Sequence, residues 1–286
     1  MSQKGDAAPK GGRFPLRLNQ MAAAAPRPTV ARELLRPQAH LQAAERDRRS
    51  VVTPQGLGLD SVHVRRRMVD RLKADGLQHP AVLDAFARLP RHLFVDTALV
   101  NQAYEDTSLP IGLGQTISKP SVVGAMLALL CIRPGLSAMA SVARPLGACL
   151  EIGTGCGYQA ALLATLSRQV VSIERLRDLH LKARQNLDVV RRSLPDWPDV
   201  RLVYGDGMLG HPPSAPYDTI IAAAGGNALP EAWLNQLAPG GRLVAPMNDG
   251  RGNGQVLTVV DRHLDGRLEQ TVAGAVLFVP LKSGIT

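Results

Sequence analysis

A short glycine-rich run in the middle of the chain has the residue types and spacing of a ligand-binding turn. An acidic residue is followed by glycines at alternate positions, between an apolar stretch typical of a strand and one typical of a helix. Glycines let the backbone turn tightly and approach a ligand without interference from a Cβ atom, and they leave the helix N-terminus open to that ligand. The candidate binding residues of this run are Glu151, Gly153, Thr154, Gly155 and Gly157.

Two further acidic residues follow later strands of the expected sheet. Glu174 ends the second strand, 17 residues after Gly157, where a carboxylate can accept hydrogen bonds from both hydroxyls of a ribose. Asp206 follows the third strand, where it can accept from an adenine amino group while Gly207 lets the base lie close. Solvated acids and turn formers are the simpler interpretations of these positions. The carboxyl ends of consecutive parallel strands converge, which favours one shared crevice.

A second candidate site precedes the glycine run. Residues 103–120 are rich in polar and turn residues although they lie between two expected helices, which is typical of a functional segment. Within them, Thr116, Ile117 and Ser118 are candidates to line a binding site. Ser118 can also act as the N-cap of a helix that begins near Pro120. No Ser/His/Asp order or G-x-S-x-G turn accompanies this serine, so a nucleophilic role is not indicated.

The pattern along the chain predicts the elements that hold these residues. Helical spacing of apolar residues predicts helices over 61–76, from Pro80 and from Pro120. Short apolar runs then alternate with longer amphipathic segments, as in a parallel sheet covered on both faces. The expected strands are 148–152, 170–173, 200–204, 218–223 and 241–245, and the expected helices between them are 158–167, 176–194 and 230–237. Residues 254–260 and 264–279 alternate like an antiparallel pair at the sheet edge.

Charge and composition limit the partners. The net charge is +9, but residues 1–50 hold ten basic and four acidic residues, +6, which leaves +3 for the other 236. The basicity therefore belongs to an Ala/Pro/Arg-rich extension, 1–55, which we expect to be disordered. Its acid-poor start also resembles a transit peptide, but it has few hydroxyl residues and weak amphipathicity. The nearly balanced remainder, with 3% aromatic residues, argues against specific nucleic-acid binding.

Cysteines and apolar runs indicate the compartment. The three cysteines, Cys131, Cys149 and Cys156, lack metal-like spacing, and two lie in apolar stretches, which is typical of buried thiols in a reducing compartment. No run approaches the ~20 apolar residues of a membrane span, and the start lacks a signal-peptide core. We therefore expect a cytoplasmic protein without a membrane anchor or a bound metal, and a monomer.

The glycine spacing is the usual form in class I S-adenosylmethionine-dependent methyltransferases, and the segment upstream of it narrows the resemblance. Residues 60 to 281, roughly, closely resemble the protein-L-isoaspartate O-methyltransferase family. The matching motifs are Arg91–Val95, the G-Q-T-I-S-x-P run Gly114–Pro120, Glu151–Tyr158, Tyr204–Gly207, Ala215–Asp218, and Gln236-Leu237 followed by Gly240–Val244. G-Q-T-I-S-x-P is the most specific of them. Lys119 and Asp96 depart from the family pattern, where Gln or His and proline are expected.

The resemblance implies a Rossmann-like, doubly wound, mostly parallel α/β sheet with antiparallel C-terminal edge strands and an N-terminal helical subdomain. It implies a methyltransferase domain over 56–286, with a helical, substrate-binding part at 56–135 and a core that binds S-adenosylmethionine at 148–286. Residues 136–147 look like an inserted loop. The implied reaction is methylation of the free α-carboxylate of isoaspartyl residues in damaged peptides and proteins. Ser118 matches the family's active-site serine and is expected to position that carboxylate.

Three other functions are compatible with parts of the sequence. A class I methyltransferase that acts on another protein or small molecule can share the glycine run. A nucleic-acid-associated protein can use the basic extension as a tether. A nicotinamide dehydrogenase also has a glycine turn after a strand, but its G-x-G-x-x-G spacing is one residue longer, and Asp206 is not explained by it.

Overall fold

The computed structural model describes residues 62–134, 144–250 and 254–286. The extension expected to be disordered, 1–55, and most of the loop expected at 136–147 lie outside these residues. None of the helices in the described ranges is long and apolar enough to cross a lipid bilayer.

The predicted N-terminal helices are present. They are α2 (Val62–Ala74), α3 (Pro80–Arg88) and α4 (Pro120–Leu130). Proline opens α3 and α4 because its fixed φ suits the first turn and its missing amide is not needed there. Gly76, with φ +107°, follows α2 and ends it. Two short 3₁₀ helices, η2 (Arg91–Phe94) and η3 (Thr97–Gln102), connect α3 to the segment before α4.

A small hairpin in this segment was not predicted. Strands β1 (Leu109–Gly112) and β2 (Gln115–Ile117) pair antiparallel. Three consecutive residues at its turn have positive φ: Gly112, Leu113 at +54° and Gly114. Such short strands contain no repeat of the alternating apolar pattern, so the sequence indicated only a turn-rich stretch.

The main sheet confirms the predicted α/β fold. Its strands are β3 (Gly147–Ile152), β4 (Ser167–Glu174), β5 (Arg201–Tyr204), β6 (Tyr217–Ala222), β7 (Leu237–Asn248), β8 (Gln255–Arg262) and β9 (Leu268–Val276). They lie in the order β5-β4-β3-β6-β7-β8-β9. The first five are parallel, whereas β8 and β9 are antiparallel edge strands. The chain runs outward from β3 to one edge and from β6 to the other, so the switch point lies between β3 and β6, where α/β proteins bind ligands.

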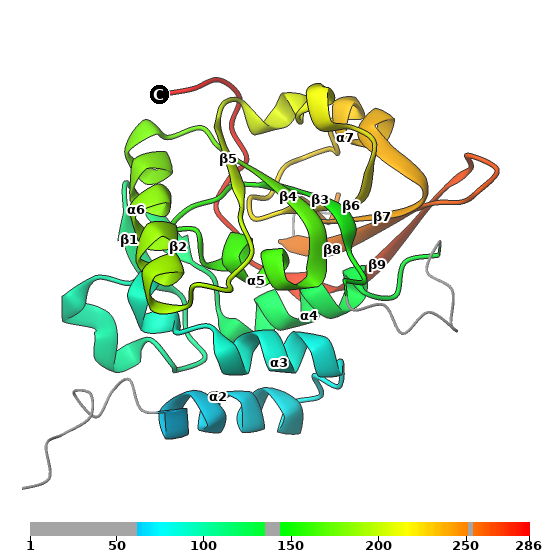
Figure 1. Ribbon diagram of the computed structural model, residues 1–286. Coiled ribbons are helices and arrows are strands. Elements are labelled where there is room, and N and C mark those ends of the chain that lie inside the picture. Colours follow the sequence, from blue (N-terminus) through cyan, green and yellow to red (C-terminus); the bar gives the residue numbers. More distant parts are fainter. Residues whose placement is uncertain (1–61, 135–143, 251–253) are drawn as a thin grey trace, which may run out of the picture. The chain divides into compact units, whose positions relative to one another are not determined.

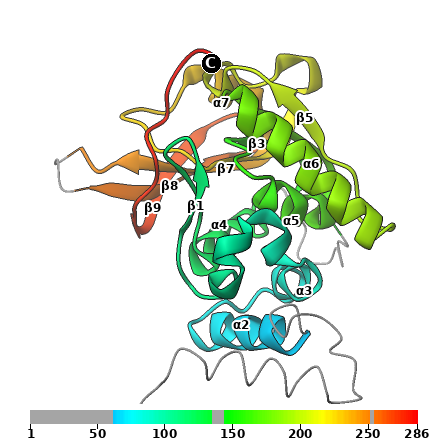
Figure 2. The same cartoon turned by 90° about the vertical axis from the view of Figure 1, so that its left-hand side faces the viewer.

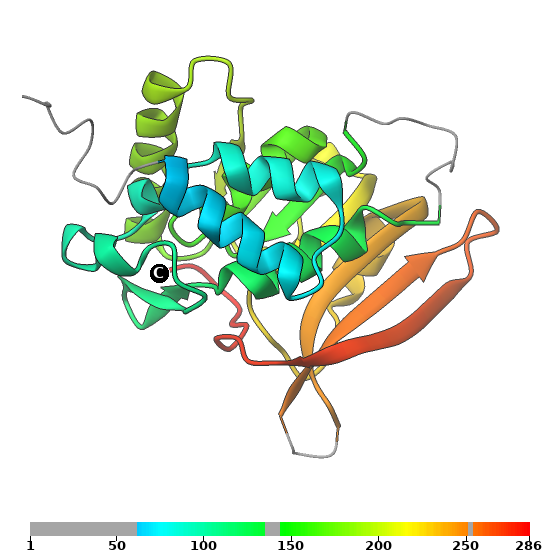
Figure 3. The same cartoon turned by 90° about the horizontal axis from the view of Figure 1, so that it is seen from below.

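Helices cover both faces of the sheet (Figures 1 and 2). Helix α5 (Tyr158–Leu166) and α6 (Arg177–Ser193) lie with α3 and α4 on one face, and α2 packs outside them, as the view from below shows (Figure 3). On the other face, α7 (Glu231–Gln236) buries Trp233 against the sheet. Eight of the nine α5 residues are buried, because neighbours enclose this helix on all sides.

Candidate active site

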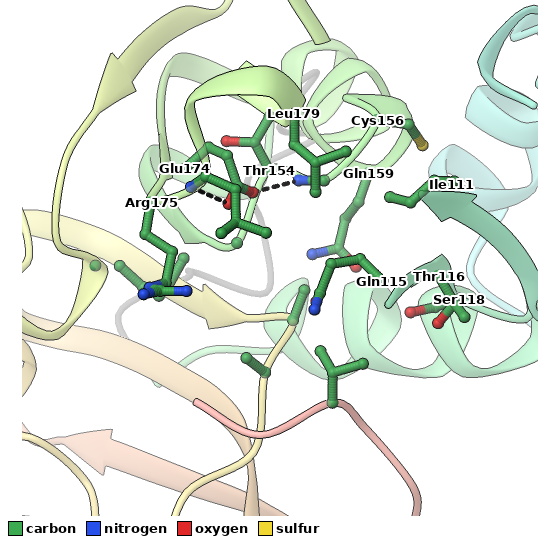
Figure 4. A pocket seen from close by; sticks show the side chains of 18 of the residues that line it. Ile111, Gln115, Thr116, Ser118, Thr154, Cys156, Gln159, Glu174, Arg175 and Leu179 are labelled. Carbon is green, nitrogen blue, oxygen red and sulfur yellow. Dashed lines mark hydrogen bonds between the residues drawn. The ribbon is translucent and has the colours of Figure 1, made fainter. Parts of the chain in front are cut away.

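A cavity of about 240 Å³ lies at the carboxyl ends of the parallel strands. It is bounded by the turn after β3, the β1–β2 hairpin and the C-terminal segment (Figure 4). Eight of the residues predicted from the sequence line it: Thr116, Ile117, Ser118, Gly153, Thr154, Gly155, Glu174 and Gly207. Three others, Glu151, Gly157 and Asp206, do not. The two segments singled out by their chemistry therefore meet at one site.

The glycine turn requires its glycines for backbone conformation. Gly153, Gly155 and Gly157 have φ of +89°, +57° and +91°, a region that side chains strongly disfavour. The Gly153 amide donates to the Ile173 carbonyl oxygen of β4 at 2.9 Å. Gly157 begins α5 and faces Ala183 of α6, 3.4 Å from where its own Cβ would lie. Gly157 therefore allows helix packing, while the other two glycines face the cavity.

Glu174 is held at the cavity by two backbone amides. The Gly155 amide donates to Glu174 Oε2 at 2.8 Å, and the Leu176 amide donates to Oε1 at 2.9 Å (Figure 4). Each carboxylate oxygen keeps a second lone pair that can accept from a ligand hydroxyl. Apolar side chains of Ile152, Ile173 and Leu179 lie in the same lining. This end of the cavity suits a ligand with adjacent hydroxyls and a flat apolar part.

Glu151 lies beneath the cavity rather than in its lining. Its side chain is fully buried, and Ser172 Oγ donates to Glu151 Oε2 at 2.5 Å. The Ser172 hydroxyl also lies 2.6 Å from Thr154 Oγ1. Burial raises the pKa of Glu151 to about 8, against the opposing effect of the Ser172 hydrogen bond. Through Ser172, this acid supports the side chain of Thr154, which faces the cavity.

Asp206 is occupied by backbone amides beside the cavity. Its Oδ1 accepts from the Met208 amide at 2.9 Å, and its Oδ2 accepts from the Gly284 amide at 2.6 Å. The neighbouring Gly207 does reach the cavity, and a Cβ there would lie 2.6 Å from Ile152 Cγ2. Gly207 is therefore required by close packing. Binding of an adenine by Asp206 stays a prediction.

The serine of the second segment has its hydroxyl available to the cavity. The N-cap of α4 is Lys119, not Ser118, so the alternative role of Ser118 as a helix cap is wrong. The Ser118 carbonyl oxygen accepts from Arg91 Nη2 at 2.9 Å. Its half-buried side chain has no hydrogen bond to the residues that the structure describes, and it points into the cavity near Thr116 (Figure 4).

Two side chains of α6 fasten the cavity walls to the core. Lys182 Nζ donates to the Ile111 carbonyl oxygen of β1 at 2.9 Å, and Asn186 Nδ2 donates to the Cys156 carbonyl oxygen at the same distance.

Two residues depart from the pattern expected of the family. Asp96 caps η3 by accepting from the Ala98 amide, and Lys119 is exposed. Neither departure removes a group from the cavity lining.

The C-terminal segment forms a wall that sequence reasoning missed. Residues 279–282 line the cavity, and the Leu281 amide donates to the Gly225 carbonyl oxygen at 2.7 Å. Arg175 Nε donates to the Gly284 carbonyl oxygen at 2.9 Å, which ties this segment beside Glu174. A short apolar run after an edge strand does not indicate from sequence that the chain turns back to the cavity. Gln159, Leu176 and Leu179 were also missed, because their helices were recognised only by periodicity.

The lining contains more groups that are suited to binding a ligand than groups that are suited to reacting with one. Glu174 and Thr154 of the glycine turn lie on one side of the cavity, and Thr116 and Ser118 lie on the other (Figure 4). Within the described ranges, no three His, Cys, Asp or Glu side chains are grouped so that they can hold a metal ion. The arrangement can bind a polar ligand at the glycine turn and bring a second ligand against it from the hairpin side.

Comparison with known proteins agrees with this geometry. A family model described as protein-L-isoaspartate(D-aspartate) O-methyltransferase matches residues 63–286. Proteins named protein-L-isoaspartate O-methyltransferase are similar to the chain: one from Methylibium petroleiphilum is 58% identical over 95% of this chain and 96% of its own length, and one from Leptothrix cholodnii is 54% identical over 96% and 95%.

Solved structures show the same fold. A protein-L-isoaspartate O-methyltransferase matches with a TM-score of 0.64 and 27% identity over 77% of this chain and 67% of that chain. A Plasmodium falciparum protein, described as a putative member in complex with S-adenosyl-L-homocysteine, matches with a TM-score of 0.63 and 22% identity over 76% and 98%. The second likeness shows the fold alone.

The buried acid beneath the cavity predicts a pH-dependent stability. The pKa of Glu151 is about 8 in the folded protein against 4.5 without burial. Between these two pH values the folded protein keeps the Glu151 proton and the unfolded chain loses it. The stability that protonated Glu151 contributes is therefore fully present below pH 4.5 and is lost as pH rises through 8. Compared with Glu151→Gln, the wild-type free energy of unfolding should fall by up to about 1.4 kcal/mol per pH unit. Urea unfolding of both proteins at pH 5, 6, 7 and 8 measures this difference. If the free energy of unfolding of the two proteins changes with pH in the same way, the prediction is contradicted.

Glu174, the buried acid in the cavity lining, is expected to contribute to ligand affinity. Glu174→Gln keeps the shape of the side chain but turns one acceptor oxygen into a donor that opposes a backbone amide and a ligand hydroxyl. Affinity for S-adenosylhomocysteine, measured by calorimetry, should fall about tenfold or more. Glu231→Gln, in the first turn of α7, is the matched control and should bind like wild type. Equal affinities of all three proteins would refute the role of Glu174.

Proposed function

The chain belongs to the protein-L-isoaspartate O-methyltransferase family, and on that premise we propose how its individual residues perform the reaction. The enzyme transfers a methyl group from S-adenosylmethionine to the free α-carboxylate of L-isoaspartyl residues in proteins. The methyl ester leaves readily when the neighbouring amide nitrogen attacks, and the resulting succinimide opens partly to normal aspartate. The reaction therefore begins a repair.

The glycine end of the cavity fits the methyl donor. S-adenosylmethionine, when bound, supplies a methyl group on a positively charged sulfonium that needs no further activation. Glu174 accepts from ribose hydroxyls, and the backbone of Gly153 and Gly155 allows close approach. The side chain of Gln159 lies in the lining beside the buried Glu151, where its amide can also reach a polar group of the ligand. These groups match a nucleoside with a charged tail.

Ser118 carries the acceptor side of the proposal. The supporting observation is its cavity-facing hydroxyl, which is not used for capping α4, in the same cavity as the glycine turn. That hydroxyl donates to one oxygen of the isoaspartyl carboxylate and leaves the other oxygen directed at the methyl group. Thr116 and Ile117 line the junction between the two ligands. Ser118 positions the substrate and does not become covalently modified.

Little acid–base chemistry is asked of the protein. A carboxylate with a pKa near ~4 is already ionised at neutral pH. The residues need only align the reacting atoms and exclude water, since alignment alone can supply several kcal/mol of the barrier. The hairpin and the C-terminal segment, which flank the cavity, serve the second task.

We also propose a cytoplasmic, monomeric enzyme whose partners are isoaspartyl-containing peptides and proteins and not specific nucleic acids. Three buried, unpaired cysteines are compatible with a reducing compartment. Concentration of the positive charge in residues 1–50 leaves the rest of the chain nearly balanced. This difference in charge is also the reason for proposing a boundary between an extension, 1–55, and a methyltransferase domain, 56–286.

Labelled methyl transfer tests the proposed function. Wild-type protein is incubated with isotopically labelled S-adenosylmethionine and an isoaspartyl peptide, or with the twin peptide that contains normal aspartate. We expect label only on the isoaspartyl peptide. Label on neither peptide, or on both equally, would contradict the assigned substrate and favour a methyltransferase with another acceptor.

Substitution of the serine tests its positioning role. Ser118→Ala removes one hydrogen bond to a charged group, so kcat/KM for the isoaspartyl peptide should fall about tenfold or more. Affinity for S-adenosylhomocysteine should remain within about twofold. Ser193→Ala, at the exposed end of α6, is the matched control. Unchanged kcat/KM in the Ser118 variant would remove this residue from the mechanism.

A further inference from the structure

A buried positive charge without a carboxylate partner lies directly behind the acceptor side of the cavity. Arg91, in η2, is 0% exposed. Among the described residues, no carboxylate oxygen lies within 4.0 Å of its guanidinium nitrogens. The sequence motif Arg91–Val95 contributed to the family resemblance, but the reaction as derived above leaves this side chain without a task.

The contacts of Arg91 are neutral groups. Its Nη2 donates to the Ser118 carbonyl oxygen at 2.9 Å and to the Thr107 carbonyl oxygen at 3.5 Å. The guanidinium carbon lies 4.7 Å from the ring centroid of Tyr158, a favourable cation–π contact. Within the described residues, its Nε and Nη1 make no hydrogen bond of good geometry, although the Tyr158 side chain lies close enough to favour the charged guanidinium. The charge is thus solvated by dipoles and one aromatic ring but is not neutralised.

The nearest acid serves another residue. Asp106 acts on Arg91 electrostatically, but its carboxylate accepts from the Ser121 amide at 2.8 Å and from Ser121 Oγ at 2.7 Å. Burial lowers the pKa of Arg91, while Tyr158 opposes that effect. An arginine nevertheless stays protonated in proteins. A buried cation without an ion-pair partner is destabilising, so its presence calls for an anion from outside the described residues.

The position of Arg91 identifies that anion. Its hydrogen-bonded neighbour Ser118 and its stacked neighbour Tyr158 both line the cavity, whereas Arg91 does not. Arg91 therefore cannot contact a ligand directly, but its field reaches the acceptor side through a low-dielectric wall, where electrostatic interactions are stronger than in water. The ligand expected there is the isoaspartyl carboxylate, which has charge −1 before methylation and 0 after it.

We propose that Arg91 is a positioning residue that makes the acceptor site selective for a carboxylate over a neutral group of the same shape. It does so in two ways: it fixes the Ser118 backbone, and its unpaired charge attracts the anion. When methylation converts the carboxylate into a neutral ester, the electrostatic attraction to Arg91 is lost, which favours release of the product. This inference rests on the proposed function of the site.

A purely structural role makes a different prediction. If Arg91 only joins η2 to α5 and to the Ser118 backbone, its replacement lowers stability and affects charged and neutral ligands alike. If its charge acts on the substrate, the ratio of the two affinities changes. Comparison of a charged and a neutral replacement separates the hydrogen bond from the charge, since Arg91→Lys keeps the charge and Arg91→Gln keeps only a donor.

The experiment measures binding of two peptides by calorimetry, with S-adenosylhomocysteine saturating. One peptide contains an isoaspartyl residue, and the other has its α-carboxylate replaced by a carboxamide. We expect wild type and Arg91→Lys to prefer the carboxylate by about tenfold or more, and Arg91→Gln to bind both peptides within about threefold. Arg88→Met, a change in a partly exposed arginine of α3 that pairs with Asp84, should retain the wild-type preference.

Two results would overturn the inference: an undiminished preference in Arg91→Gln, or equal binding of the two peptides by wild type. Affinity for S-adenosylhomocysteine reports folding, and Arg91→Met replaces Arg91→Gln as the neutral variant if the latter does not bind it. Failure of the proposed function is seen separately, as an absence of methyl transfer by wild type to the isoaspartyl peptide.

Discussion

The hydrogen bond from the Gly155 amide to the Glu174 carboxylate is the constraint on which the rest of the site depends. It joins the turn after β3 to the end of β4, two neighbouring parallel strands whose carboxyl ends meet. The positive φ of the glycines aims the amide at the acid, and the other carboxylate oxygen takes the Leu176 amide ahead of α6. One side chain therefore fixes two turns and still offers lone pairs to a ligand.

The acceptor side is built differently, from a segment that belongs to no regular layer. Hairpin β1–β2 is held by Lys182 from α6, and Ser118 is held by Arg91 from η2. The Lys182 contact joins residues 71 positions apart, so this wall depends on the folded α/β core for its position. The dependence explains how a polar, turn-rich segment is rigid enough to orient a carboxylate, as alignment of the reacting atoms requires.

The sequence predicted the strands and helices that have clear periodicity, and it predicted which segments meet at the site. It did not predict the hairpin, whose strands are too short for a pattern and depend on tertiary contacts. Motif spacing placed Glu151 among the ligand-binding residues, whereas strand alternation turns it beneath the cavity. Asp206 is occupied by Gly284, 78 residues further along. Burial of Arg91 is equally a product of tertiary packing, which no local pattern contains.

The central claim is that one cavity holds the methyl donor on Glu174 and the acceptor carboxylate on Ser118. A crystal structure of the enzyme with both S-adenosylhomocysteine and an isoaspartyl peptide tests it most directly. We predict ribose hydroxyls within hydrogen-bond distance of Glu174, and one oxygen of the isoaspartyl carboxylate within hydrogen-bond distance of Ser118 Oγ. A carboxylate bound elsewhere, or a ribose that makes no contact with Glu174, would contradict the account.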